Sequence, residues 1–391
     1  MAKAKKAKKR TPWQWFKSLW VNPGKVDGAF LLVVLLLLAF GLVTLFSSSY
    51  VYAYYNVGGD SFYFIKRQLI FALIGLVAMT FASFFDYRKF KDWAWIIYLA
   101  ALGLLMVTVV IRFAVNGGEV TRWIRIGSFQ FQPSEVAKLS VIFLFAALGV
   151  ANQKRIKTFQ YGIVPFLIVL APVVLLMMLE PHVSGTVLIC GIAASLMLIG
   201  GSNIKYFIWV AGLGAAALLI FILTGGIQYA LDRLVYWRDP FASPLKEGYQ
   251  VIQSMYAIAS GGLTGQGLGQ SKQKFLYLPE PQNDFIFAIA CEELGFVGAV
   301  LIILLFIAFV WRGFSIALRA KDQFGTLVAA GITIQFGLQA LLNMMVVTKT
   351  IPNTGISLPF LSYGGTALIM LLGEMGIMLN ISRFAAMDKP K

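Results

Sequence analysis

Long runs of apolar residues recur along the whole chain, separated by shorter polar stretches. As α-helices, runs of this length can cross the hydrocarbon core of a bilayer. The pattern predicts about ten such helices, at residues 27–47, 68–85, 93–112, 133–151, 161–179, 184–200, 206–224, 285–311, 326–347 and 366–384. The expected fold is therefore an all-α, multi-pass membrane protein.

Composition agrees with this prediction. The chain has 391 residues, of which 59% are hydrophobic and 13% are charged, and its mean hydropathy is +0.78. These values exclude an ordinary soluble globular domain. The net charge of +16 could suggest a nucleic-acid partner, but most of the basic residues lie at the termini and in short connections between spans. This placement indicates contact with a membrane surface and no nucleic acid.

The basic residues also predict the orientation of the chain. An even number of spans places both termini on one side, and the connections on that side carry most of the Lys and Arg residues. The positive-inside rule makes that side cytoplasmic. We expect a basic cytoplasmic tail with an interfacial helix at 1–26, one membrane domain at 27–384, and a short cytoplasmic tail at 385–391.

Three connections on the opposite, external side are unlike ordinary loops. They cover residues 113–138, a long loop at about 225–283, and residues 348–365, and they are rich in Gly, Pro, aromatic and charged residues. Irregular backbone near a membrane is tolerated where it is buried in protein or lines a wet cavity. The three segments therefore predict one external cavity that they build together.

An aspartate stands where the long external loop enters a membrane helix. Asp284 follows the polar sequence PEPQN and precedes the apolar sequence FIFAIA. An ionisable group at the membrane edge is costly and indicates function. The alternative is that Asp284 caps the helix, because Asp is favoured near helix N-termini.

Segment 113–138 supplies further charged side chains for the predicted cavity. Glu135 and Lys138 follow Pro133 at the start of a span, three residues apart, and so lie on one helical face. They could neutralise each other, or they could form a cavity wall in which Arg122 and Lys138 bind an anionic group. The glycines at 261–269 lack the lysine and the strand of a phosphate-binding loop, so we expect a turn that lines the cavity.

Other ionisable residues interrupt the apolar runs. They are Glu180, His182, Glu292, Glu293 and Glu374. Such groups could form a proton relay, or they could pair between helices, which we favour. Because His182 is the only histidine, a metal site built from several histidines is excluded.

Taken in order, these motifs resemble the SEDS family (shape, elongation, division and sporulation), which includes FtsW, RodA and SpoVE. The matching blocks are KRQL at 66–69, NGG…RWI…GSFQFQPSEVAKL at 116–139, GGLTGQGLG at 261–269, LPEPQNDFIFAIACEELG at 278–295 and IPNTGISLPFLSYGG at 351–365. The KRQL block and the serines at 47–49 are more similar to the division and sporulation branch. One block departs from the family pattern: many members have QPD.GT where this chain has EPHVSGT, so His182 replaces an acid.

The resemblance implies an enzyme, a peptidoglycan glycosyltransferase in the cytoplasmic membrane of a bacterium. It would polymerise lipid II on the external face and release undecaprenyl diphosphate, in cell division or sporulation. Because an α-linked diphosphate becomes a β-1,4 bond, the anomeric centre inverts, and one displacement needs a general base. The catalytic aspartate of the family maps onto Asp284. No cofactor is implied with certainty, although a divalent cation, Mg²⁺ or Mn²⁺, could help to stabilise the diphosphate.

The resemblance and the charge pattern together predict a set of substrate-binding residues: Arg67, Arg122, Glu135, Lys138, Lys349, Ser362 and Tyr363. The expected partners are lipid II, membrane lipids and a class B penicillin-binding protein, which would supply crosslinking. Two alternatives remain open at this point. The chain could be a lipid II flippase or transporter, or a scaffold for a transpeptidase without activity of its own.

Overall fold

A computed structural model of the 391-residue chain describes Trp20 and residues 24–115, 117, 121–126, 129–209, 212, 237–244 and 248–386. Most of these residues are helical. The long helices are α2 (Gly28–Asn56), α3 (Tyr63–Phe84), α4 (Lys89–Val110), α5 (Pro133–Ala151), α7 (Val164–Leu179), α8 (Val183–Ile199), α12 (Ile286–Leu318), α13 (Gln323–Val347) and α14 (Gly365–Ala386). The shorter elements are a π-helical turn (Ile111–Val115), strands β1 (Ile124–Ile126) and β2 (Phe129–Phe131), α6 (Phe159–Gly162), a 3-10 turn (Pro240–Ala242) and α11 (Tyr249–Gly261).

The predicted membrane helices are largely confirmed. Within the described residues, eight helices are long and apolar enough to cross a membrane, and α8 is a shorter apolar helix of 17 residues. The span predicted at 206–224 lies mostly outside the described residues, so the total of ten stays a prediction. The interfacial helix predicted in the tail at 1–26 also lies almost wholly outside them.

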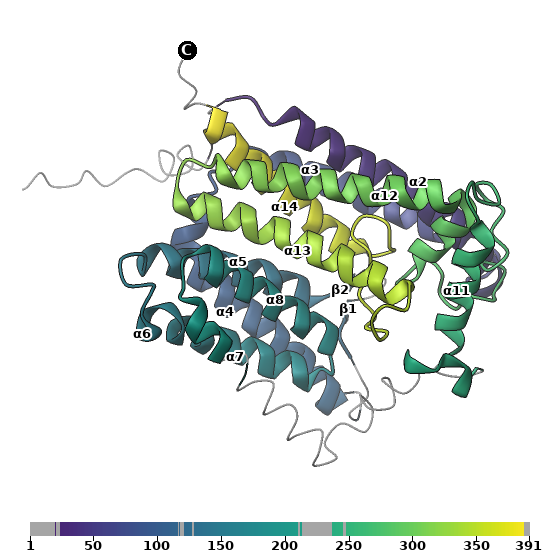
Figure 1. Ribbon diagram of the computed structural model, residues 1–391, viewed down its shortest axis with the longest axis horizontal. Coiled ribbons are helices and arrows are strands. Elements are labelled where there is room, and N and C mark those ends of the chain that lie inside the picture. The colour runs from purple at the N-terminus through teal and green to yellow at the C-terminus, as the bar shows by residue number, and fades with distance from the viewer. Residues whose placement is uncertain are drawn as a thin grey trace, which may run out of the picture.

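The long helices form two groups around one central helix. Helices α2, α3, α12 and α14 pack together, and so do α4, α5, α7 and α8, while α13 contacts both groups. Figure 1 shows these helices lying roughly side by side along the long axis of the molecule. Because α13 is in the middle, its polar residues can reach a site between the two groups.

Small residues allow the closest helix pair, α3 and α14, to pack. A Cβ atom on Gly376 would lie 2.3 Å from the carbonyl oxygen of Met79, and one on Gly75 would lie 2.5 Å from Leu372 Cδ1. In a membrane the apolar lipid tails give little drive for helix association, so close backbone approach is an important source of attraction. These glycines fix α14 against α3 and so fix the segment that precedes α14.

The two ends of the bundle differ. At the end where α2 begins and α14 finishes, the Asp27 amide donates to Ser382 Oγ (3.1 Å), and Asp27 pairs with Arg312 (2.6 Å). The Tyr87 hydroxyl donates to the Asp322 carboxylate at the same level of the bundle. The opposite end carries the irregular segments, with α11, β1 and β2 (Figure 1). We call it the loop-rich end.

The sequence did not predict the small hairpin at the loop-rich end. Strands β1 and β2 are antiparallel, with Arg125 opposite Gln130. Three residues per strand are too few to show an alternating pattern, so the segment was expected to be irregular. The helix expected after GYQ in the long loop is present as α11.

Candidate active site

A cavity of about 640 Å³ opens at the loop-rich end, between the two helix groups. All three irregular segments line it. Residues of 122–125 and 130–138 form one wall, and residues of 280–284 and 355–357 form another. Residues 363–365 complete the cavity together with the ends of α2 and α3. The prediction that these distant segments build one cavity is confirmed.

Three neighbours hold the backbone around Asp284 in place. Asn343 Nδ2, on the central helix α13, donates to the carbonyl oxygen of Asp284 (2.7 Å). The Ser362 hydroxyl donates to the carbonyl of Asn283 (2.8 Å), and the Tyr363 amide donates to the carbonyl of Gln282 (2.8 Å). The segment before α14 and the core of the bundle therefore fix where Asp284 lies.

The side chain of Asp284 lines the cavity and does not cap α12. Phe285 occupies the N-cap position, and no side chain caps this helix, so the capping interpretation is wrong. Burial and the nearby Glu280 carboxylate together raise the pKa of Asp284 to about 6, against the opposing effect of Arg122. A carboxylate with this pKa is ionised at neutral pH and still basic enough to accept a proton.

Cationic side chains face the same cavity. Arg67, Arg122, Arg125 and Lys138 all line it. Lys138 is buried and pairs with Glu135 at 2.8 Å, as the three-residue spacing predicted. The positive charge of Lys138 is thus partly balanced, and the arginines add further positive charge to the cavity wall.

Two of the arginines donate hydrogen bonds to oxygen atoms beside the cavity. Nη2 of Arg122 donates to the carbonyl oxygen of Pro181 (2.6 Å), and Nη1 of Arg67 donates to the Tyr63 hydroxyl (2.7 Å). These hydrogen bonds help to hold both guanidinium groups in the cavity wall. The arrangement suits an anionic group, since arginine binds phosphate oxygens through several N–H donors.

The structure brings together most of the predicted site residues. Asp284, Arg67, Arg122, Glu135, Lys138 and Tyr363 line the cavity. Ser362 lies behind its wall, where the hydroxyl accepts from the Leu358 amide and donates to Asn283. Lys349 does not line the cavity: it lies beyond the end of α13, and its carbonyl accepts from Trp237 Nε1. Glycines 261–269 do not line it either, because they pack against α12.

Sequence reasoning missed several polar residues of the cavity wall, among them Glu280 and Gln339. Glu280 lies four residues before Asp284 and adds a second carboxylate. Gln339 lies on α13, and its Oε1 accepts from Lys138 Nζ (3.2 Å). The signal for Gln339 is the spacing of Gln335, Gln339 and Asn343, four residues apart on one helical face of an otherwise apolar helix.

The interior acids Glu374 and Glu180 accept hydrogen bonds from residues on other helices, which favours pairing between helices over a proton relay. Glu374 accepts from Gln335 Nε2 (2.9 Å), and Glu180 accepts from the Thr108 hydroxyl. Burial lowers the pKa of His182 to about 3, with Arg122 and Lys138 adding to the effect. A histidine that stays neutral at physiological pH cannot carry a proton through a relay as an imidazolium.

The predicted divalent cation has no cluster of protein ligands in the described part of the chain. No group of three or more His, Cys, Asp or Glu side chains there is placed to hold a metal ion. The donor set at Asp284 and Glu280 alone does not form a protein-only cation site.

Comparison with known proteins matches the chain to one family along most of its length. The family model of FtsW, RodA and SpoVE, described as cell cycle protein, matches residues 28–387. Stage V sporulation protein E of Bacillus subtilis (strain 168) is 41% identical over 360 residues, covering 92% of this chain and 97% of that protein. The probable peptidoglycan glycosyltransferase FtsW of Geobacter sp. (strain M18) is 37% identical, covering 91% and 96%.

Solved structures show the same fold. A chain in the structure described as "Structural coordination of polymerization and crosslinking by a peptidoglycan synthase complex" matches with a TM-score of 0.74 and 28% identity, covering 93% of this chain and 99% of that one. The rod shape determining protein RodA of Thermus thermophilus matches with a TM-score of 0.66 and 26% identity, covering 92% and 97%. The chain is therefore a multi-pass membrane protein that belongs to the FtsW, RodA and SpoVE family.

Proposed function

We propose that this protein is a peptidoglycan glycosyltransferase that polymerises lipid II during cell division or sporulation. One observation carries the proposal: a half-buried carboxylate, Asp284, faces cationic side chains across one cavity. The names of the most similar relatives support the assignment, since they are a sporulation protein and probable peptidoglycan glycosyltransferases.

Asp284 acts as the general base. Its carboxylate takes the proton from the 4-hydroxyl of the acceptor sugar, and the hydroxyl oxygen attacks the anomeric carbon of the donor from the face opposite the diphosphate. The new β-1,4 bond forms as the bond to the diphosphate oxygen breaks, with inversion and without a covalent enzyme intermediate. A single carboxylate of suitable pKa is sufficient for this step.

The arginines of the cavity stabilise the leaving group. Negative charge develops on the bridging oxygen of undecaprenyl diphosphate as it departs, and fixed positive charges lower the energy of that state. Arg122 and Arg67 suit this task, because both line the cavity, where hydrogen bonds help to hold their guanidinium groups. Lys138 contributes less net charge, since Glu135 pairs with it.

The placement of the cavity suits a lipid-linked substrate. It lies at one end of the helix bundle, where the polar sugar and diphosphate can bind while the polyprenyl chains remain in the bilayer. We assign this end to the extracytoplasmic side of the inner membrane, from the distribution of basic residues. A class B penicillin-binding protein is the proposed partner, because a similar chain belongs to a complex that couples polymerization with crosslinking.

A flippase requires a polar route through the bundle, and the packing of the opposite end disfavours one. There Asp27, Arg312 and Arg319 form ion pairs that link α2 with α12. The polar wall of the cavity is concentrated at the loop-rich end. Polymerisation in detergent, where no membrane remains to be crossed, distinguishes the two functions directly.

The test is polymerisation of lipid II by the purified protein with its partner transpeptidase in detergent, followed by separation of the glycan strands on a gel. We expect strands from the parent protein and a rate lower by about 10³-fold for Asp284→Asn, because a positioned base contributes about 10²- to 10⁴-fold. Asp284→Asn should purify with the partner as the parent does. Equal rates for the two proteins would refute the assignment of the base, and no strands from the parent would refute the function.

A further inference from the structure

Asp284 is carried by a short helical piece and not by the whole of α12. At Gly295 the backbone leaves the helical conformation, with φ 67° and ψ −166°. This break separates residues 286–294 from the long span at 296–318. Helical hydrogen bonds do not fix the direction of the short piece relative to the span, so other contacts must do so.

The glycine run at 261–269 fills the break in α12. The amides of Phe296 and Val297 donate to the carbonyls of Gly262 and Leu263 (2.9 and 3.1 Å), instead of to the preceding helical turn. The carbonyls of Glu292 and Glu293 accept from the amides of residues 266 and 267 (2.9 and 3.0 Å). The run thus has a structural purpose: it satisfies the backbone groups that the break sets free.

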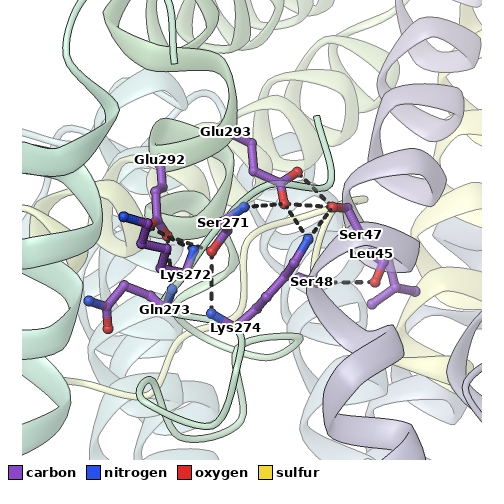
Figure 2. Close-up of polar contacts among 9 residues, drawn as sticks. All are labelled: Leu45, Ser47, Ser48, Ser271, Lys272, Gln273, Lys274, Glu292 and Glu293. Carbon is purple, nitrogen blue, oxygen red and sulfur yellow. Dashed lines mark hydrogen bonds and ion pairs between the residues drawn. The ribbon is translucent and has the colours of Figure 1, made fainter. Parts of the chain in front are cut away.

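Two neighbouring carboxylates hold the far end of the short piece (Figure 2). Glu292 accepts from the Ser271 hydroxyl (2.5 Å) and from the backbone amides of the next two residues in the loop, 272 and 273. Glu293 pairs with Lys274 Nζ (2.8 Å) and accepts from the Ser47 hydroxyl (2.6 Å). These contacts link the short piece to the long loop and to α2.

Lys274 contributes a buried positive charge to this cluster. Its side chain is 0% exposed, and its ammonium lies 4.8 Å from the centre of the Tyr50 ring, close enough for a cation–π contact. An isolated buried ammonium would be very costly, so the pair with Glu293 is what permits Lys274 to lie there. The Lys274 side chain therefore joins the long loop to α12 through Glu293 and to α2 through Ser47 and Tyr50.

We propose that the cluster of Ser47, Ser271, Lys274, Glu292 and Glu293, which we call the clamp, positions Asp284 for catalysis. The clamp holds the far end of the short piece, while Asn343 and Ser362 hold the end that carries Asp284. The inference rests on the proposed role of Asp284 as the base. Lys274 does not touch the substrate cavity and acts through Asp284, so it is a positioning residue.

Buried ion pairs add little net stability, because desolvation cancels much of the attraction between the charges. A better-attested use is to specify one arrangement among several, and an enzyme needs that specification most at its reacting groups. A displacement of about 1 Å at a reacting group can lower a rate by about 100-fold. The clamp lies two helical turns from Asp284, so a tilt of the short piece moves the carboxylate.

The test compares Lys274→Met with Lys272→Met in the polymerisation assay. Both remove one positive charge from the same loop, but the Lys272 side chain is exposed and only its amide contacts Glu292. We expect kcat to fall by about 100-fold in Lys274→Met, with KM within about 3-fold, because the cations of the cavity are unchanged. Lys272→Met should keep kcat within about 2-fold of the parent.

A second measurement separates positioning from a general loss of folded protein. Loss of folded molecules lowers the rate equally at all pH values. Displacement of Asp284 toward water instead moves the acidic limb of the kcat/KM profile to lower pH, because burial is the main cause of its raised pKa. Hydrogen exchange at the amides of residues 285–291 should also be faster in Lys274→Met and unchanged in Lys272→Met.

Lys274→Met leaves Glu293 buried without its cation and could unfold the protein. The double variant Lys274→Met/Glu293→Gln avoids the unpaired charge and keeps side chains of similar size. We expect it to fold and still to show a kcat at least about 10-fold below that of the parent. A folded double variant with the parent kcat and the parent acidic limb would overturn the proposal.

The parent and Asp284→Asn are assayed beside the clamp variants, so that the two proposals fail separately. An inactive parent, or an active Asp284→Asn, refutes the proposed function and removes the ground for the clamp. If the parent is active, Asp284→Asn is inactive, and Lys274→Met behaves as Lys272→Met does, the base assignment stands and the clamp proposal is wrong.

Discussion

The pH dependence of polymerisation tests the environment of Asp284, because a general base works only when it is ionised. Burial and the Glu280 carboxylate raise the pKa of Asp284 to about 6 from a usual value of 3.8. Because a carboxylic acid gains its charge as pH rises, kcat/KM should increase about tenfold per pH unit below 6 and level off above it. The free-enzyme pKa appears in kcat/KM and not in kcat.

The size of the expected effect at pH 5 follows from this pKa. With a pKa of about 6, about one tenth of the Asp284 side chains are ionised at pH 5, and kcat/KM is about one tenth of its plateau. With a pKa of 3.8, more than about nine tenths would be ionised at the same pH. The difference of about 2 pKa units corresponds to about 3 kcal/mol in favour of the protonated form.

The assay measures initial rates of lipid II consumption at a concentration well below KM, between pH 4.5 and 8 and at constant ionic strength. Samples held at each pH and then assayed at pH 7.5 correct for irreversible loss of enzyme. Asp284→Asn, assayed in parallel, shows whether any remaining rate has the same limb. A rate at pH 5 within about twofold of the plateau would refute the assignment of a buried carboxylate as the base.

Two further substitutions test the neighbours of Asp284 and the packing of the glycine run. Glu280→Gln removes a negative charge beside Asp284, so the acidic limb of kcat/KM should move to lower pH; a limb that stays in place would show that the two carboxylates do not interact. Gly265→Ala places a Cβ 2.1 Å from the carbonyl oxygen of Glu293 at φ +82°, whereas Gly269→Ala has nearly the same φ (+81°) and no atom within 4 Å. In thermal unfolding in detergent both should lose about 1–2 kcal/mol from the left-handed backbone, and only Gly265→Ala should lose more; equal losses would contradict the close approach.

The membrane helices could be predicted from the sequence because burial in lipid requires long apolar runs. Hydropathy marks where a helix lies in the membrane, but it does not mark where the helix ends. Helix α2 was expected to finish at residue 47, and it continues to Asn56, through serine and tyrosine residues that remain helical beyond the apolar run. The break at Gly295 was not predicted, because glycine is common in membrane helices and only tertiary contacts give it a positive φ.

The site was partly predictable for a related reason. Asp284 attracts notice because a charge at the membrane edge is costly, and the pair of Glu135 and Lys138 follows from helical spacing. Within the clamp, only Glu292 and Glu293 give such a signal, because they interrupt an apolar run. Lys274 lies in a polar loop 19 residues before Glu293, and Ser47 is more than 200 residues away from both. Only the fold shows that this lysine is buried.

The two ends of the short piece at 285–294 show how one sequence block can serve both structure and chemistry. The Glu293 carboxylate accepts from the Ser47 hydroxyl, the Lys274 ammonium and the Ser271 amide, so its lone pairs are occupied and its charge is locked in place. The Asp284 carboxylate accepts no such bond within the described part of the chain and faces the cavity. The donors around Glu293 hold that side chain in one place, whereas the Asp284 side chain faces the space where a substrate can bind. The contrast assigns a structural role to Glu293, within the short helical piece, and a chemical role to Asp284, just before it.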